Sequence, residues 1–229
     1  MPYENYTIKS GPNEGKVKRV FYPDANQTNR KTLKILEKVP YPTPEELYEE
    51  MMTHNWPYKR NADNFILRDR AFIAMTYLLG SRESESLRIT KKHIRLDIAD
   101  DKAIPVDPFP LSKSKHGSIP RKHQFRDGFL PLVGDRAMFT KAFLEYYDTL
   151  KNEDEDRLLF PIVDSRIRQI ALKTIPKYCT HWLRAFCEDK LYVDWKFDIV
   201  GVADYVKVDV KTVEGYLRSG WKRSANRAA

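Results

Sequence analysis

The sequence HWLRAFCEDKL at residues 181–191, followed by GVADYVKVDVKTVEGYLR at residues 201–218, is the most informative stretch of the chain. His181 and Arg184 are three residues apart, so they share one face of the helix that this segment predicts, while Trp182, Phe186 and Leu191 can pack beneath it. An H-x-x-R pair is often an ordinary surface ion pair. A metal site is disfavoured because no second His, Cys or clustered carboxylate stands at ligand spacing.

The second part of this stretch predicts two short helices joined at residues 208–209, with Asp209 capping the second and Tyr216 lying on it. A tyrosine in such a helix usually fills a core. Here it is flanked by six basic side chains, an unusual setting for an inert aromatic: Lys207, Lys211, Arg218, Lys222, Arg223 and Arg227.

The composition indicates one well-packed core, or one domain with an extra arm. The 229 residues are 41% hydrophobic and 12% aromatic, and their formal net charge is +8. This charge favours an anionic partner such as nucleic acid, although surface charge kept for solubility is the alternative. No apolar run reaches the roughly 18 residues of a membrane span, and no signal peptide is present, so we expect a soluble, cytoplasmic protein without a membrane partner. Cys179 and Cys187 are too few for a disulfide framework, and we expect both to be reduced.

The domain organisation predicted from the sequence is a basic N-terminal arm or linker at residues 1–42 and a folded domain at residues 43–229. The arm lacks periodic apolar pattern and could follow a DNA backbone, or it could be a solvated tail that packs only at KTLKILEKV, residues 31–39. Thr43, Pro44 and Glu46 form a capping signal for the first helix of the domain. Apolar spacing predicts a core helix at residues 64–79, ended by Gly80, and an amphipathic helix at residues 135–150.

Alternating patterns predict two strands, at residues 93–107 and 126–133, joined by a basic connection. Residues 111–126 hold five Lys or Arg, two His and no acid, and Lys115 lies two positions before Gly117, with Lys113 close by. Such a connection can reach a phosphate, or it can be a mobile solvated loop. The acidic run at residues 152–157 marks a surface turn that would face away from a polyanion, and residues 164–173 predict a further helix. The predicted fold class is α+β, mainly α-helical with a small antiparallel β-sheet.

The segment GSRESESL at residues 80–87 places Arg82 in a tight turn directly after the core helix. A guanidinium held there can be presented rigidly to an oxyanion. The common alternative is a helix cap or a surface ion pair.

Taken in order, these segments resemble the tyrosine recombinases, also called phage-type integrases. Residues 80–87 are similar to the first box of that family, with Arg82 after a glycine and a buried helix, and HWLRAF is similar to its second box, H-x-L-R-H-x-F. The 32-residue step from Arg184 to Tyr216 and the nine-residue step from Lys207 to Tyr216 are also similar to the family's spacing. The resemblance covers roughly residues 43–229, and each box is weak alone.

Three departures accompany the resemblance. Lys207 stands where the family usually has histidine or tryptophan, a substitution more typical of archaeal and archaeal-virus members, and Ala185 replaces the usual second-box histidine. Residues 1–42 are too few for the helical DNA-clamping domain common in the family, so both a minimal enzyme and a catalytic fragment stay open.

The resemblance implies site-specific DNA recombination, by integration or excision, through a 3′-phosphotyrosyl intermediate. Arg82 and Arg184 would hold the phosphate, Tyr216 would attack it, and Lys115, or Lys113, would protonate the leaving oxygen, assisted by His181 and Lys207. The reaction would need no cofactor, metal or ATP. The expected partners are double-stranded DNA and further copies of the chain, as a tetramer on paired sites. The alternatives are a non-catalytic DNA-binding protein, and relaxation or telomere resolution on a single duplex by the same chemistry.

Overall fold

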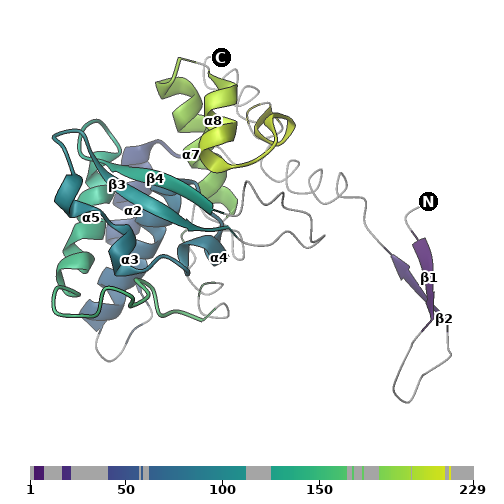
Figure 1. The fold of residues 1–229 in the computed structure, drawn as a ribbon, viewed down its shortest axis with the longest axis horizontal. Helices are drawn as coiled ribbons and strands as arrows, with labels where there is room; N and C mark the ends of the chain where they lie inside the picture. The colour runs from purple at the N-terminus through teal and green to yellow at the C-terminus, as the bar shows by residue number, and fades with distance from the viewer. Residues whose placement is uncertain are drawn as a thin grey trace.

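The computed structural model describes the folded domain and one N-terminal strand pair (Figure 1). The described residues are 3–7, 17–21, 41–56, 58, 62–111, 125–163, 167, 172, 181–196, 198–214 and 217, with backbone alone for 3–7, 17–21 and 181. The α-helices are α2 (Pro44–Thr53), α3 (Ala62–Leu79), α4 (Glu83–Ser86), α5 (Ala137–Asp148), α7 (His181–Asp194) and α8 (Ile199–Val206). The strands are β1 (Tyr3–Thr7), β2 (Val17–Phe21), β3 (Ala103–Pro110) and β4 (Phe125–Pro131), and two short 3-10 helices are η1 (Lys91–His93) and η2 (Leu96–Ile98).

Helix α2 begins as the capping signal predicts. The Thr43 hydroxyl accepts the backbone N–H of Glu46 (3.2 Å), and the Glu46 carboxylate accepts the backbone N–H of Thr43 (2.7 Å), so both partners of the capping box are formed. Such a cap contributes about 1 kcal/mol. Leu47 and Met51 then bury this helix against the core.

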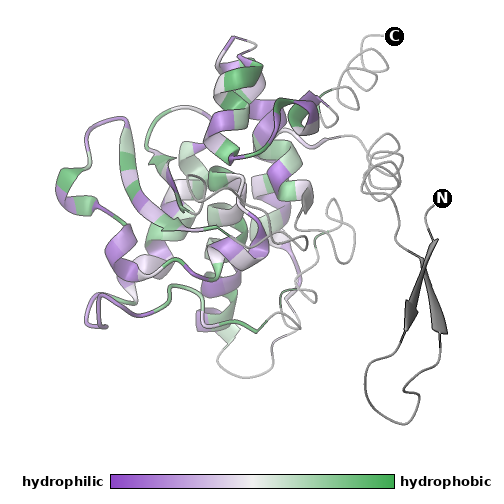
Figure 2. Ribbon diagram, turned by 45° about the vertical axis from the view of Figure 1, so that its right-hand side comes forward, coloured by the Kyte–Doolittle hydropathy of each residue, from purple (hydrophilic) through white to green (hydrophobic). Residues whose placement is uncertain are grey.

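Helix α3 is the central element of the domain. It packs against α5, α7 and β4, which lie around it in Figure 1, and every residue from position 71 to position 79 is buried. The sequence predicted burial on a single apolar face, but this half of the helix is buried on all of its faces. At the N-terminal end the prediction places too many residues in the core, because Phe65 is 37% exposed. Its ring lies against Tyr58 and beneath the Arg68 guanidinium. Figure 2 shows hydrophilic positions along the outer sides of the helices and loops around this core.

The sheet of the domain consists of β3 and β4, which pair antiparallel from Ala103 and Pro131 to Pro110 and Phe125. The prediction of a strand at residues 126–133 is confirmed within two residues. The prediction of a strand at residues 93–107 is wrong in its first part, because η1 and η2 occupy most of residues 91–98. Local turn chemistry is the reason: the Asp100 carboxylate accepts the backbone N–H groups of Lys102 and Ala103, so the strand begins only there.

The remaining predicted elements of the domain are confirmed where the structure describes them. Helix α5 buries Phe139 and Phe143, and the acidic run at residues 152–157 lies at the surface. The buried Lys91 ammonium holds that turn, since it donates to the carbonyl oxygens of Lys151 (3.1 Å) and Glu153 (3.0 Å). Of the predicted helix at residues 164–173, only positions 167 and 172 are described, so the prediction stays a prediction.

The N-terminal arm contains structure that its sequence did not predict. Strands β1 and β2 pair antiparallel in a two-stranded sheet of their own, from Tyr3 opposite Phe21 to Thr7 opposite Val17. The KTLKILEKV segment lies outside the described residues. None of the helices within the described ranges combines the length and the apolar character that crossing a membrane requires. The fold class is thus the predicted one, mainly α-helical with a small antiparallel sheet.

Candidate functional site

The C-terminal end of α3 is where the other elements of the site meet. Gly80 ends this helix with φ +55°, a left-handed conformation that glycine adopts without strain. Arg126, the second residue of β4, is 1% exposed and donates to the carbonyl oxygens of Leu79 and Gly80, the latter at 3.4 Å. Its guanidinium also lies over the rings of Phe109 and Tyr205. Arg126 therefore caps the helix from which the Arg82 turn starts.

Side chains of α7 and α8 bind the same helix end. The Leu78 carbonyl oxygen accepts the hydroxyl of Tyr205 (3.3 Å) and faces the Cys187 Sγ at 3.6 Å. Burial raises the pKa of Tyr205 to about 12 and that of Cys187 to about 11, so both groups are neutral donors at pH 7. Cys187 is a free, buried thiol, which confirms the prediction for this residue, while Cys179 lies outside the described residues. The carbonyl end of α3 thus joins β4, α7 and α8.

Arg82 stands at the N-terminus of α4, directly after this junction. Its backbone N–H donates to Glu85 Oε2 (2.9 Å) and its Nη1 donates to Glu85 Oε1 (2.8 Å). The hydroxyls of Ser81 and Ser86 lie 2.5 Å apart and fix the turn from within. The Arg82 side chain is 36% exposed, whereas that of Glu85 is fully buried. Within the described part of the chain only Nη1 of this guanidinium has a side-chain partner, so its remaining N–H groups can receive a ligand.

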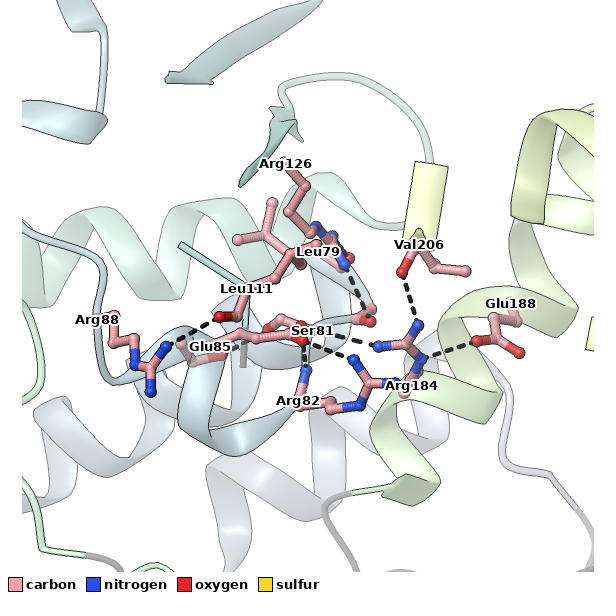
Figure 3. A network of polar contacts seen from close by, with 12 residues as sticks. Leu79, Ser81, Arg82, Glu85, Arg88, Leu111, Arg126, Arg184, Glu188 and Val206 are labelled. Carbon is pink, nitrogen blue, oxygen red and sulfur yellow. Dashed lines mark hydrogen bonds and ion pairs between the residues drawn. The ribbon is translucent and has the colours of Figure 1, made fainter. Parts of the chain in front are cut away.

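Arg184 approaches the same carboxylate from α7 (Figure 3). Its Nη1 lies 3.8 Å from Glu85 Oε2, its Nε donates to Glu188 Oε1 (3.0 Å), and its Nη2 donates to the carbonyl oxygen of Val206 (2.6 Å). Nη1 makes no hydrogen bond within the described residues. The structure therefore brings the two predicted arginines together on one buried carboxylate, which lies between them.

The cluster formed by Arg82, Arg126, Arg184, Glu85 and Glu188 contains more positive than negative groups. Burial alone would raise the pKa of Glu85, but the fields of Arg184 and Arg82 and the bond from the Arg82 backbone lower it below its ordinary value. Burial also raises the pKa of Glu188, and there the neighbouring Arg184 does not reverse the shift. With Arg126, three guanidiniums face two carboxylates. One unit of positive charge remains when both carboxylates are ionised, which suits a monoanionic phosphodiester.

Lys207 lies next to the carbonyl that binds Arg184, at the C-cap of α8. It adopts a left-handed conformation with φ +52°, and its Nζ pairs with Asp204 Oδ1 at 2.9 Å. The helix predicted to carry Tyr216 begins after it, where the Asp209 carboxylate accepts the backbone N–H of Lys211 (2.8 Å), as predicted. Residues 210–214 are helical. Tyr216 itself lies outside the described residues.

Of three more predicted residues, the structure describes only the backbone of His181. His181 is the first residue of α7, one helical turn before Arg184, and only its backbone is described. Lys115 and Lys113 lie outside the described residues, but both ends of their connection are anchored at the site. Arg88 Nη1 donates to the carbonyl oxygen of Leu111 (2.9 Å) at one end, and Arg126 binds the α3 terminus at the other.

Sequence reasoning missed three members of the cluster, Glu85, Glu188 and Arg126. The first two stand three and four positions after an arginine on a helix, which is the spacing of a helical ion pair and could have indicated them. Arg126 had no local signal beyond its place in the basic connection, because its partners lie in α3. The predicted packing of α7 is confirmed, since Trp182, Phe186 and Leu191 are all buried.

The sequence matches no known protein-family profile and no curated protein. The fold, in contrast, is similar to solved structures of the XerH site-specific recombinase bound to its difH substrate. One is a pre-cleavage complex with the difH substrate, with a TM-score of 0.56 and 16% identity over 82% of this chain. Another is a post-cleavage complex with a palindromic difH substrate, with a TM-score of 0.56 and 16% identity over 92% of this chain. This chain spans 53% and 59% of the length of those two chains. The likeness confirms the predicted tyrosine recombinase catalytic-domain fold.

Proposed function

We propose that this chain is a tyrosine recombinase that cleaves and rejoins double-stranded DNA through a covalent bond to Tyr216. The observation that carries the proposal is the meeting of Arg82 and Arg184 on Glu85. The two arginines come from segments far apart in the sequence, and each has N–H groups without a partner in the described part of the chain. The XerH site-specific recombinase shares the fold and was solved with its difH substrate before and after cleavage, which supports DNA as the ligand.

A phosphodiester has two non-bridging oxygens, and the cluster offers two guanidiniums for them. Arg82 is the more exposed of the two and would meet the phosphate first, while Arg184, only 2% exposed, would engage it through Nη1 once the surrounding chain admits the phosphate. In-line attack places additional negative charge on these oxygens, and fixed guanidiniums stabilise that charge without reorganisation. Each arginine is therefore expected to contribute about 10²- to 10³-fold to the rate, as single oxyanion donors do.

The bonds made and broken balance without a cofactor. The Tyr216 hydroxyl gives up its proton to solvent, with His181 or Lys207 assisting the transfer, and its oxygen forms a bond to phosphorus. The bond from phosphorus to the 5′ oxygen breaks, and Lys115 gives that oxygen a proton, which leaves a 3′-phosphotyrosyl bond and a free 5′-hydroxyl. His181 and Lys207 would orient the phosphate or assist proton transfer. Attack by a second 5′-hydroxyl reverses the steps and returns the proton to the tyrosine. Recombination between two duplexes would require several copies of the chain, and we propose a tetramer on paired sites.

The experiment begins by selecting a duplex that the full chain binds from a random-sequence pool. A nicked version of that duplex then traps the covalent intermediate, because the short strand released after cleavage cannot religate. The wild-type chain is expected to form a denaturant-resistant complex in the presence of EDTA, and Tyr216→Phe is expected to bind the duplex but form none. Arg82→Lys and Arg184→Lys should slow complex formation by about 10²- to 10³-fold.

The outcomes separate the candidate activities. Salt-sensitive binding without any covalent complex would assign the chain to non-catalytic DNA-binding proteins. A covalent complex that survives Tyr216→Phe would refute the assignment of the nucleophile. Exchange of strands between two differently labelled duplexes distinguishes recombination from relaxation of a single duplex.

A further inference from the structure

The orientation of the Arg184 guanidinium is fixed at two of its three nitrogens. Nε donates to Glu188 and Nη2 donates to the backbone of Val206, so the plane of the group is set and Nη1 points toward Glu85 and Arg82. A planar guanidinium held in this way can point its remaining N–H groups in only one direction. Of these two hydrogen bonds, only the one to Glu188 is to a side chain. Glu188 lies on the same helix as Arg184, one turn later.

Glu188 is poorly suited to a purely structural role. It is fully buried, its Oε1 accepts the bond from Arg184, and its Oε2 makes no hydrogen bond within the described residues. A buried carboxylate oxygen without a donor destabilises the folded state, and buried ion pairs are often replaceable by apolar groups without loss of stability. Glu85 differs, because both of its oxygens accept hydrogen bonds.

We propose that Glu188 is a positioning residue, which aims Nη1 of Arg184 at the scissile phosphate. The inference rests on the proposed function, since it deepens the role of Arg184 in it. Position 188 then requires a side chain long enough to place an acceptor oxygen opposite Arg184 Nε, and this requirement matters more than a negative charge. Burial raises the pKa of Glu188, which agrees with a weak requirement for the ionised form.

Two substitutions separate geometry from charge. Glu188→Gln keeps the length and the acceptor oxygen but removes the charge, and its amide nitrogen can take the place of the unpaired Oε2. Glu188→Asp keeps the charge but shortens the side chain by one methylene and withdraws the acceptor from Nε. A positioning role predicts that the glutamine variant reacts faster than the aspartate variant, whereas a role in neutralising Arg184 predicts the reverse. Glu145→Gln on the exposed side of α5 is the matched control.

The rate of covalent complex formation is measured for the full chain at saturating nicked duplex, with thermal unfolding recorded for each variant. E188Q and E145Q are expected to react at close to the wild-type rate, and E188D roughly tenfold to a hundredfold more slowly, as misplaced catalytic groups do. The duplex affinity should change little, because Arg184 makes one contact among many. The proposal is overturned if E188D reacts like the wild type, or if E188Q is as slow as E188D while E145Q is unaffected.

A spectroscopic measurement covers the case in which E188D does not fold. The ¹⁵N resonance of the Arg184 Nε–H, identified by its loss in Arg184→Lys, should be protected from exchange with water in the wild type and in E188Q. Rapid exchange in the folded wild type would overturn the positioning contact whatever the cleavage assay gives. Absence of any wild-type covalent complex would instead count against the proposed function, and the exchange measurement would still test the contact.

Discussion

The two buried carboxylates of the site should lose different amounts of stability when they are neutralised. Glu85 is surrounded by donors, since both of its oxygens accept hydrogen bonds from Arg82 and Arg184 Nη1 lies 3.8 Å away. In Glu85→Gln the amide nitrogen must therefore face a donor. Loss of one partner of a buried ion pair costs about 3–5 kcal/mol, and at about 2–4 °C per kcal/mol the midpoint of thermal unfolding should fall by roughly 6–20 °C. Glu188→Gln keeps the acceptor for Arg184 Nε and exchanges one unpaired polar atom for another. Because burial already disfavours the charge of Glu188 and raises its pKa, this substitution should cost less than Glu85→Gln.

The pH dependence of these effects has opposite sign for the two residues. The pKa of Glu85 is lowered in the folded state, so its stabilising contribution is complete above the ordinary value of 4.5 and is lost as the pH falls through the folded-state pKa. The gap in stability between the wild type and E85Q should therefore close in acid. The pKa of Glu188 is raised, so its contribution is complete below 4.5 and is lost as the pH rises through the folded-state pKa. E188Q should accordingly gain on the wild type as the pH rises.

Urea unfolding followed by circular dichroism, repeated across a pH series, measures both gaps. Glu83→Gln in the same short helix is the control for loss of an acidic side chain near a helix N-terminus, and it should change the free energy of unfolding by about 1 kcal/mol or less. The reasoning is refuted if E85Q is no less stable than E83Q, or if both gaps change in the same direction with pH.

Two further pairs of variants test the backbone around the site. Gly80→Ala should destabilise the chain by at least about 1 kcal/mol more than Gly134→Ala, measured by thermal unfolding. Both glycines have positive φ, but a Cβ at Gly80 would lie 2.9 Å from Val206 Cγ1, whereas Gly134 has open space. Lys207→Gly and Lys196→Gly should both relieve a left-handed conformation, worth up to about 1 kcal/mol. Only K207G should slow covalent complex formation, by about a hundredfold, and equal rates for the two variants would remove Lys207 from the site.

Much of the fold could be predicted because its signals are local. The capping box at Thr43 and Glu46 needs only a four-residue window, and the apolar spacing of α5 needs three turns. The prediction failed where a side chain binds the backbone in place of a strand partner. The Asp100 carboxylate accepts the backbone N–H groups of Lys102 and Ala103, so β3 begins at Ala103 and not at residue 93. It also failed where the surroundings decide burial, because residues 71–79 of α3 are buried on every side, with α5, α7 and β4 packed around the helix.

Two of the three guanidiniums that meet at the candidate site, Arg82 and Arg184, could be predicted from the sequence, whereas its two carboxylates and its third guanidinium were not predicted. Arg82 and Arg184 were indicated by the order and spacing of two short segments, and the structure brings them together. Glu85 and Glu188 were within reach as helical partners of these arginines, yet a spacing of three or four residues is common on any charged helix and does not distinguish a buried pair from an exposed one. Arg126 could not be found from the sequence, since its role is defined by carbonyl groups of α3.

The junction at the end of α3 explains how such distant segments form one site. A helix that ends inside a protein leaves carbonyl groups that need donors, and here the donors are Arg126 from β4, Tyr205 from α8 and the Cys187 thiol from α7. Each of these contacts also fixes the element that supplies it. The strand that leads out of the basic connection, the helix that carries Arg184 and the helix that precedes Lys207 are thereby held against the turn that presents Arg82. The same carbonyl groups that would destabilise an uncapped helix end therefore determine where Arg82 and Arg184 meet, which is why loss of the Gly80 turn should disturb the candidate site as well as the stability.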